Sequence, residues 1–307
     1  MLSIVTTTKP FLQNNAIIQK DAIQSWLRLR PECEVILVGN DEGAAEVART
    51  FGLTHVPVTE HNEYGSTLLD SLLASAQKVA RFDLICYIHS DIILMSDFLP
   101  AIQLVRDRRF LVVGQRTDLD LKEPVQFTDP LWESRLRAEA AAHGKLHPGA
   151  GISYFVFPRG LYNDVPPFAI GRTGEDNWLI YKARLLNVPV IDATRVVTVI
   201  HQNHDYSHHA QGAAGVWRGP ETAQNVELVN GRDHAFTTEY ATEFITPQGV
   251  RPALTPRSIY FRMRAWPILH PGFGFLLAPF KIFEALVRRA RKTDLPRSSS
   301  ESKPDVA

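Results

Sequence analysis

The chain has 307 residues, 45% of them hydrophobic, and its 33 basic residues balance its 33 acidic residues. A chain of this length and composition can bury one large core, or one core with a smaller appendage. Because the formal net charge is zero and no local basic patch stands out, we expect no nucleic-acid partner.

Cysteine usage and the first residues indicate a reducing compartment. Cys33 and Cys86 both lie in apolar, strand-like runs. Met1 leads into "LSIVTTT", which lacks the basic region and the long apolar region of a secretory signal. We therefore expect a cytoplasmic protein.

The first part of the chain alternates short β-branched runs with longer amphipathic segments. Strands are predicted at residues 2–8, 34–40, 54–58 and 84–88, and helices at residues 13–29, 42–52 and 66–80. Such alternation predicts an α/β fold with a mostly parallel sheet covered by helices on both faces. In that architecture ligands collect at the carboxyl ends of the strands.

The later part of the chain is less regular. Residues 117–151 are long and polar, and we expect part loop and part helix there. Further strands are predicted at residues 152–157, 188–193 and 196–200, and a helix at residues 174–186. From residue 211 to residue 256 no element is predicted.

This pattern predicts four regions. They are an α/β catalytic domain at residues 1–210, its C-terminal elaboration at 211–265, an amphipathic membrane-associating or packing segment at 266–292, and a disordered tail at 293–307. The tail prediction follows from its Ser, Pro and charged residues.

The run "DLICYIHSDIILMSDF" begins as a strand and then places His89, Ser90 and Asp91 at the strand end. Asp91 would project from the sheet edge, where its oxygens could hold a hard divalent cation. The alternative is a turn residue, because Asp is common before a bend. Asp97, just before "FLPAIQLV", suits an N-cap that accepts backbone N–H bonds.

In "GRTGEDNWLIYKA", two adjacent carboxylates, Glu175 and Asp176, open a helix. Adjacent helical residues diverge by about a quarter turn, so we expect only one of them to face a substrate. The alternative is acid placement in the first turn, which favours the helix dipole. Trp178, Leu179 and Tyr181 are expected in the core.

The segment "VVTVIHQNHDYSHH" carries His201 and His204 after a strand, and His208 and His209 close it. Zinc would need three or four nitrogen or sulfur ligands, yet both cysteines lie in other strands and no H-E-x-x-H motif is present. We expect one strand-end histidine to serve a site built elsewhere, with a solvated polar loop as the alternative.

The order of these motifs resembles glycosyltransferases of the GT-A fold, particularly glycosyltransferase family 2. A strand-end "HSD", a "GED" helix start and a later strand-end histidine carry the resemblance, which covers roughly residues 2–205. It implies a GT-A-like (Rossmann-like) α/β domain that binds a nucleotide-diphosphate sugar. It also implies Mn²⁺ or Mg²⁺ held by a D-x-D motif and a later histidine, and an Asp base near a helix start.

Carried over by position, the resemblance implies that Asp91 and His201 or His204 are metal ligands and that Asp176 is the base, with Glu175 beside it. It implies nucleotide-sugar contacts from Thr6, Thr7, Thr8, Lys9, Asp41, Gly65, His89, Ser90 and Asp91.

Two departures from the family pattern leave the donor and the acceptor open. His89 stands where the family has its first Asp, and "GSTLLDSLLAS" lacks the Arg-Asn pair that often follows the loop glycine. His89 therefore also motivates a non-catalytic nucleotide-sugar-binding pseudoenzyme. A nucleotidyltransferase is the other alternative, although "TTTKPFLQNN" lacks the glycines expected of its phosphate loop.

We predict a metal-dependent, inverting glycosyltransferase that moves a sugar onto an acceptor hydroxyl of an unknown glycan, lipid or protein. Asp176 would remove the hydroxyl proton. His201 is preferred to His204 as a ligand because it directly follows a strand, where a parallel sheet would place it at the same carboxyl edge as Asp91. Mixed oxygen and imidazole ligands favour Mn²⁺ over Mg²⁺.

The segment "WPILHPGFGFLLAPFKIFEALVRRARK", residues 266–292, combines aromatic and aliphatic residues with a basic end. It is too interrupted to span a bilayer, which needs about 20 apolar residues. We predict peripheral contact with the cytoplasmic membrane face, with Arg288, Arg289, Arg291 and Lys292 toward anionic lipid. Packing against the catalytic domain is the alternative.

Overall fold

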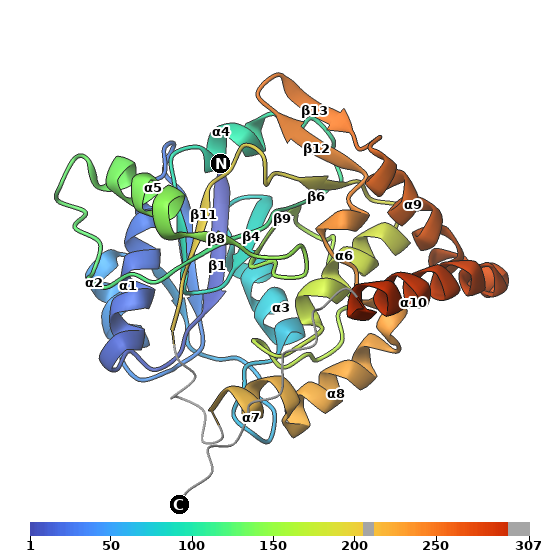
Figure 1. The fold of residues 1–307 in the computed structure, drawn as a ribbon. Coiled ribbons are helices and arrows are strands. Elements are labelled where there is room, and N and C mark those ends of the chain that lie inside the picture. Colours follow the sequence, from blue (N-terminus) through green and yellow to red (C-terminus); the bar gives the residue numbers. More distant parts are fainter. Residues whose placement is uncertain (205–211, 294–307) are drawn as a thin grey trace, which may run out of the picture. The chain divides into compact units, whose positions relative to one another are not determined.

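A computed structural model describes residues 1–204 and 212–293 of the chain (Figure 1). The chain divides into two compact units, and the boundary in the sequence lies between Ile259 and Tyr260. The expectations for His208, His209 and the tail beyond residue 293 lie outside the described residues.

The helices and strands alternate through most of the first unit. The strands are β1 (Leu2–Thr7), β2 (Glu34–Val38), β3 (Thr54–Val56), β4 (Leu84–Ile88), β5 (Ile92–Leu94), β6 (Leu111–Val113), β7 (Thr117–Leu119), β8 (Lys145–Leu146), β9 (Tyr154–Pro158), β10 (Val190–Asp192), β11 (Val199–Gln202), β12 (Glu243–Thr246) and β13 (Gly249–Pro252). The α-helices are α1 (Gln13–Leu27), α2 (Ala44–Phe51), α3 (Leu69–Val79), α4 (Phe98–Gln103), α5 (Trp132–His143), α6 (Glu175–Leu185), α7 (Gly212–Arg218), α8 (Pro220–Val229), α9 (Pro256–Leu269) and α10 (Ala278–Thr293). The described residues also form the 3₁₀ helices η1 (Arg232–His234), η2 (Thr238–Tyr240) and η3 (Pro271–Leu277).

Among the described residues, nine strands form one mixed sheet in the order β13-β12-β10-β6-β9-β4-β1-β2-β3. Strands β4, β1, β2 and β3 are successive parallel neighbours, and so are β6, β10 and β12. Strands β9 and β13 pair in antiparallel fashion with their neighbours. The predicted α/β fold with a mostly parallel sheet is confirmed.

Continuous apolar strands form this sheet because both of its faces are buried. Ile4 and Leu37 pack in one core cluster with Trp26 of α1, whose side chain is fully buried. The alternate residues Val5 and Ile36, which point to the opposite face, are also fully buried. Figure 1 shows α1 and α2 on one side of the central strands and α3 and α6 on the other.

A second, four-stranded sheet has the order β5-β11-β7-β8. Strand β11 runs antiparallel to β5, which pairs His201 with Ile92, and parallel to β7, which pairs His201 with Asp118. The expectation that His201 follows a strand of the main parallel sheet is therefore wrong, because His201 lies within β11 of this second sheet. Asp91 lies in the turn between β4 and β5, where the chain passes from the first sheet to the second.

Asp97 stands at the N-cap position of α4 but makes no side-chain capping bond, so the predicted cap is wrong. Its Oδ2 instead accepts the Thr198 N–H at 3.1 Å and lies 2.8 Å from Nη2 of Arg137. The Asp97 carboxylate therefore links the start of α4 to Thr198, the residue before β11, and to Arg137 of α5.

The region after residue 211, where no element was predicted, contributes α7, α8, β12 and β13. Strand β12 extends the main sheet beside β10. Helix α8 is anchored by Asn225, whose buried side chain accepts the Ala169 N–H at 2.9 Å and donates to the Ala169 carbonyl at 3.0 Å. This anchor sets α8 beside the loop that leads into α6.

The second unit contains most of α9 together with η3 and α10. Glu284 of α10 accepts hydrogen bonds from the Tyr260 hydroxyl at 3.2 Å and from Nε of Arg264 at 2.7 Å, which joins α9 to α10. Across residues 1–204 and 212–293, no helix is both long and apolar enough to cross a membrane.

Asp21 provides a test of the core around α1. It is 4% exposed, and its Oδ2 accepts the Val125 N–H at 2.9 Å. Burial raises the pKa of Asp21 to about 6, although the Val125 hydrogen bond opposes this. Because the folded pKa lies above the unfolded value, the stability of the wild type that depends on Asp21 is present at low pH and is lost as the pH rises through about 6.

We therefore expect Asp21→Asn, which cannot ionise, to gain stability relative to the wild type by about 2 kcal/mol between pH 4.5 and pH 8. Urea unfolding of both proteins at several pH values measures the difference. If the stability difference between the two proteins stays constant over this pH range, the pKa of Asp21 is not raised by folding, and the prediction is wrong.

Candidate functional site

A cavity of about 570 Å³ opens at the carboxyl ends of β1 and β4. It lies where a parallel sheet places ligand-binding loops. Every residue predicted for the site lines this cavity: Thr6, Thr7, Thr8, Lys9, Asp41, Gly65, His89, Ser90, Asp91, Glu175, Asp176, His201 and His204. The structure thus brings these residues together, and their individual roles stay predictions.

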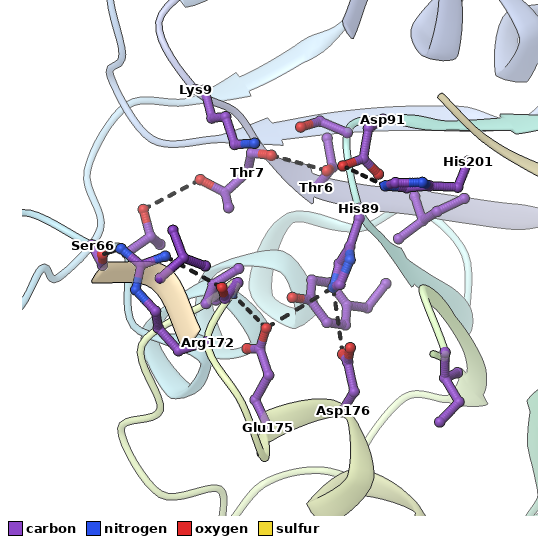
Figure 2. Close-up of a pocket in the computed structure, with 18 of the residues that line it drawn as sticks. Thr6, Thr7, Lys9, Ser66, His89, Asp91, Arg172, Glu175, Asp176 and His201 are labelled. Carbon is purple, nitrogen blue, oxygen red and sulfur yellow. Dashed lines mark hydrogen bonds and ion pairs between the residues drawn. The ribbon is translucent and has the colours of Figure 1, made fainter. Parts of the chain in front are cut away.

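Asp91 faces two imidazole rings (Figure 2 shows the pair with His201). Its Oδ2 lies 3.6 Å from Nε2 of His201 and 3.3 Å from Nε2 of His204. One ligand atom from each of the three residues falls within 4.8 Å of the others. His201 and His204 both reach Asp91 because β11 pairs antiparallel with β5, which begins immediately after Asp91.

These three side chains fit a divalent cation. Oδ1 of Asp91 is buried and has no hydrogen-bond partner among the described residues, so one ligand oxygen remains unused. A carboxylate oxygen with two imidazole nitrogens is a donor set that suits Mn²⁺ better than Mg²⁺, which prefers oxygen.

The charges around Asp91 also favour its ionised form. Burial would raise the pKa of Asp91, but His201, His204 and His89 outweigh burial and hold it well below its usual range. Burial would likewise lower the pKa of His201, but Asp91 and Asp118 raise it to about 9. Without a cation, a proton on the His201 ring therefore offsets the negative charge of Asp91. A bound cation would have to displace that proton.

Both carboxylates of the "GED" motif approach one ring, which corrects the expectation that only one could face the site. Nε2 of His89 lies 3.4 Å from Oδ1 of Asp176 and 4.0 Å from Oε1 of Glu175 (Figure 2). The longer Glu175 side chain reaches back to accept the Gly171 N–H at 2.6 Å. Neighbouring positions on a helix point about a quarter turn apart. Glu175 still approaches the same ring as Asp176 because its side chain is one methylene longer.

The two carboxylates differ in their surroundings. Glu175 is 1% exposed, whereas the Asp176 side chain is 19% exposed. Burial first, and then the charge of Asp176, raises the pKa of Glu175 well above its usual value. Burial would lower the pKa of His89, but Asp176, Glu175 and Asp91 raise it to about 9. Near neutral pH, His89 is therefore an imidazolium, and burial favours the neutral form of Glu175 beside it.

Gln19 of α1 ties the loop after β1 to the "HSD" turn. Its Oε1 accepts the Lys9 N–H at 2.7 Å and the Ser90 hydroxyl at 3.1 Å, and its Nε2 donates to the Lys9 carbonyl at 2.9 Å. Because Gln19 is only 2% exposed, its side chain has little contact with water, and these hydrogen bonds fix the position of the loop after β1 relative to the "HSD" turn. Nζ of Lys9 lies 3.4 Å from Nε2 of His204, at the edge of the Asp91 cluster.

Thr7 and Thr8, at the end of β1, also line the cavity. The Thr7 hydroxyl lies 3.3 Å from that of Thr67, and the Thr8 hydroxyl donates to Oδ2 of Asp41 at 3.4 Å. Gly65 adopts φ 85°, a conformation that favours glycine, in the loop before Thr67. This part of the cavity therefore presents hydroxyls and backbone groups, which suit a polar ligand such as a nucleotide.

Sequence reasoning missed several further polar residues that line or support the cavity. Arg116 and His147 line it, and both contact Asp118 of β7, with Arg116 Nε at 3.0 Å and His147 Nδ1 at 2.6 Å from its oxygens. The alternation of "TDLDL", with Leu119 between Asp118 and Asp120, is the signal that could have indicated a short strand there.

Arg172 forms another part of the wall. Its Nε and Nη2 both contact Oε2 of Glu221, at 2.8 and 2.7 Å, and Nη2 also donates to the Ser66 hydroxyl at 3.2 Å. Oε1 of Glu221 accepts a bond from Asn62 at 2.7 Å. This network joins α8, the loop before α6 and the loop before α3 around one side of the cavity.

No protein family model matches this sequence, and no curated protein matches it. Solved structures show a partial likeness. The mannosyltransferase PcManGT from Pyrobaculum calidifontis, solved with GDP-Man and Mn²⁺, is 18% identical with a TM-score of 0.42 over 68% of this chain. The match spans 59% of the mannosyltransferase chain, less than two thirds of its length.

Two other structures are similar to a comparable degree. Glucosyl-3-phosphoglycerate synthase from Mycobacterium tuberculosis, with Mg²⁺ and UDP, is 15% identical with a TM-score of 0.44, covering 75% of this chain and 78% of its own. S. aureus TarS 1-349 with UDP-GlcNAc is 14% identical with a TM-score of 0.45, covering 67% of this chain and 60% of its own.

Proposed function

We propose that this protein is a glycosyltransferase that moves a sugar from a nucleotide-diphosphate donor to an acceptor hydroxyl, with inversion at the anomeric carbon. One observation carries the proposal: a single cavity holds a cluster suited to a divalent cation, Asp91 with His201 and His204, together with the carboxylates Glu175 and Asp176. Such a transfer needs positive charge at the leaving diphosphate and a base at the attacking hydroxyl.

Different residues of the cavity would bind the nucleotide and the cation. The hydroxyl-lined loop after β1, with Thr8 and Asp41, would receive the nucleotide. Asp91, His201 and His204 would hold Mn²⁺ or Mg²⁺, which when bound supplies positive charge to the diphosphate. Lys9 lies at the edge of the same cluster and would add a cationic group there.

Asp176 would accept the proton of the acceptor hydroxyl as the hydroxyl oxygen attacks. Glu175 is less suited to this role, because it is almost fully buried, and burial and the charge of Asp176 raise its pKa well above its usual value. The imidazolium of His89, 3.4 Å from Oδ1 of Asp176, would hold the base in place. His89, which stands where the resembled family has its first Asp, would thus support the base. A non-catalytic pseudoenzyme would not need a histidine in contact with Asp176.

We expect Asp176→Asn to lower turnover about 100-fold or more, the scale of losing general-base help, while donor binding stays nearly unchanged. The matched control is Glu175→Gln, which keeps the buried shape and should cost less. Steady-state kinetics with a donor found by binding assays measures both. A larger effect at Glu175 would reverse the assignment, and a fully active Asp176→Asn would place the base elsewhere or indicate a retaining mechanism.

We also propose that residues 266–292 contact the cytoplasmic membrane face. Phe275, Ile282, Phe283 and Leu286 are each more than half exposed in the second unit. Exposed apolar side chains next to the basic run "RRARK" are typical of segments that bind anionic lipid. Of the four basic residues predicted to face lipid, only Arg289 has a described side chain, and it is exposed.

Sedimentation with vesicles tests this contact. We expect full-length protein to pellet with vesicles of phosphatidylglycerol and phosphatidylcholine, and Ile282→Ser to bind about tenfold more weakly, because one buried aliphatic side chain contributes about 1.5 to 3 kcal/mol. The control is Val226→Ser, which changes an exposed apolar residue of α8 and should bind as the wild type does. Wild-type protein that stays in the supernatant would favour the packing alternative.

A further inference from the structure

Asp118 lies behind His201, on the side away from Asp91. The parallel pairing of β7 with β11 sets Asp118 directly beside His201. Oδ1 of Asp118 lies 3.2 Å from Nδ1 of His201, whereas Oδ2 of Asp91 lies 3.6 Å from Nε2. Two carboxylates therefore contact different nitrogens of the same ring.

The surroundings of Nδ1 determine which nitrogen of His201 is available to a cation. Besides Asp118, the side-chain oxygen of Asn203 lies 3.1 Å from Nδ1. The Asn203 amide nitrogen donates to Asp120 at 2.8 Å, which fixes the oxygen toward His201. A ring nitrogen between two oxygen acceptors carries a proton and donates it. The nitrogen left to bind a cation is Nε2, on the Asp91 side.

Other side chains hold Asp118 rigidly in this position. Nε of Arg116 lies 3.0 Å from Oδ1, and Nδ1 of His147 lies 2.6 Å from Oδ2. Arg116 is fastened in turn, because Nη1 donates to the hydroxyl of the fully buried Ser153 at 2.7 Å. A carboxylate with partners on both oxygens cannot rotate freely, so it orients the ring that it contacts.

We propose that Asp118 is a positioning residue, which holds His201 with Nδ1 protonated and Nε2 directed to the divalent cation that Asp91 and His204 also bind. This inference rests on the proposed metal site and deepens it. Carboxylates that orient histidine ligands in this way typically contribute 10- to 100-fold to metal affinity.

The test is the affinity for Mn²⁺ alone, measured by electron paramagnetic resonance of the free ion. We expect Asp118→Asn to bind Mn²⁺ about 10- to 100-fold more weakly than the wild type. Because Asp118 acts through His201, the same substitution in a His201→Ala background should cause little further loss. Circular dichroism confirms folding, and Asp118→Ala replaces Asp118→Asn if the latter does not fold.

The matched control is His147→Ala, which removes the other imidazole that contacts Asp118 and leaves His201 in place. We expect it to lose less Mn²⁺ affinity than Asp118→Asn, because the Asp118 carboxylate and its contacts with Arg116 and His201 remain. The proposal is overturned if Asp118→Asn binds like the wild type, if His147→Ala loses as much, or if the loss persists without His201. Wild-type protein that does not bind Mn²⁺ would overturn the metal site itself, and with it this role of Asp118.

Discussion

The largely buried carboxylate of Asp91, whose Oδ1 has no access to solvent, sets the main constraint on this fold. An ionised carboxylate away from water needs compensating positive charge or hydrogen bonds. His201 and His204 supply that compensation, and they reach Asp91 only because β11 lies antiparallel to β5 in the second sheet. The chain therefore needs both sheets to meet at one turn, and the cavity opens where they meet.

The rest of the site follows from the same meeting point. Gln19 fastens the loop after β1 to the "HSD" turn, and α6 brings Glu175 and Asp176 to the ring of His89. The protein thus holds several charges of alternating sign in a small, partly buried volume. The histidines favour the ionised form of Asp91, and the carboxylates favour the charged form of His89, whereas burial and the charge of Asp176 raise the pKa of Glu175.

Much of the main sheet could be predicted from the sequence, and so could the gathering of the predicted site residues around one cavity, because continuous apolar strands end in polar residues at one edge. The second sheet could not, since its strands have only two to four residues and take their partners from distant segments. Asp118 and His147 depend on that sheet, so their contacts were missed. Asp97 looked like a local cap, but tertiary contacts with Thr198 and Arg137 use its carboxylate instead.

The central claim is that a nucleotide diphosphate and a divalent cation bind together at Asp91. Isothermal titration of a panel of nucleoside diphosphates, with and without Mn²⁺, tests it most directly in the wild type and in Asp91→Asn. The account predicts that at least one diphosphate binds the wild type about tenfold or more tightly with Mn²⁺, and that Asp91→Asn loses this enhancement. It would be contradicted if no diphosphate binds in the presence of Mn²⁺, or if the enhancement persists without the Asp91 carboxylate.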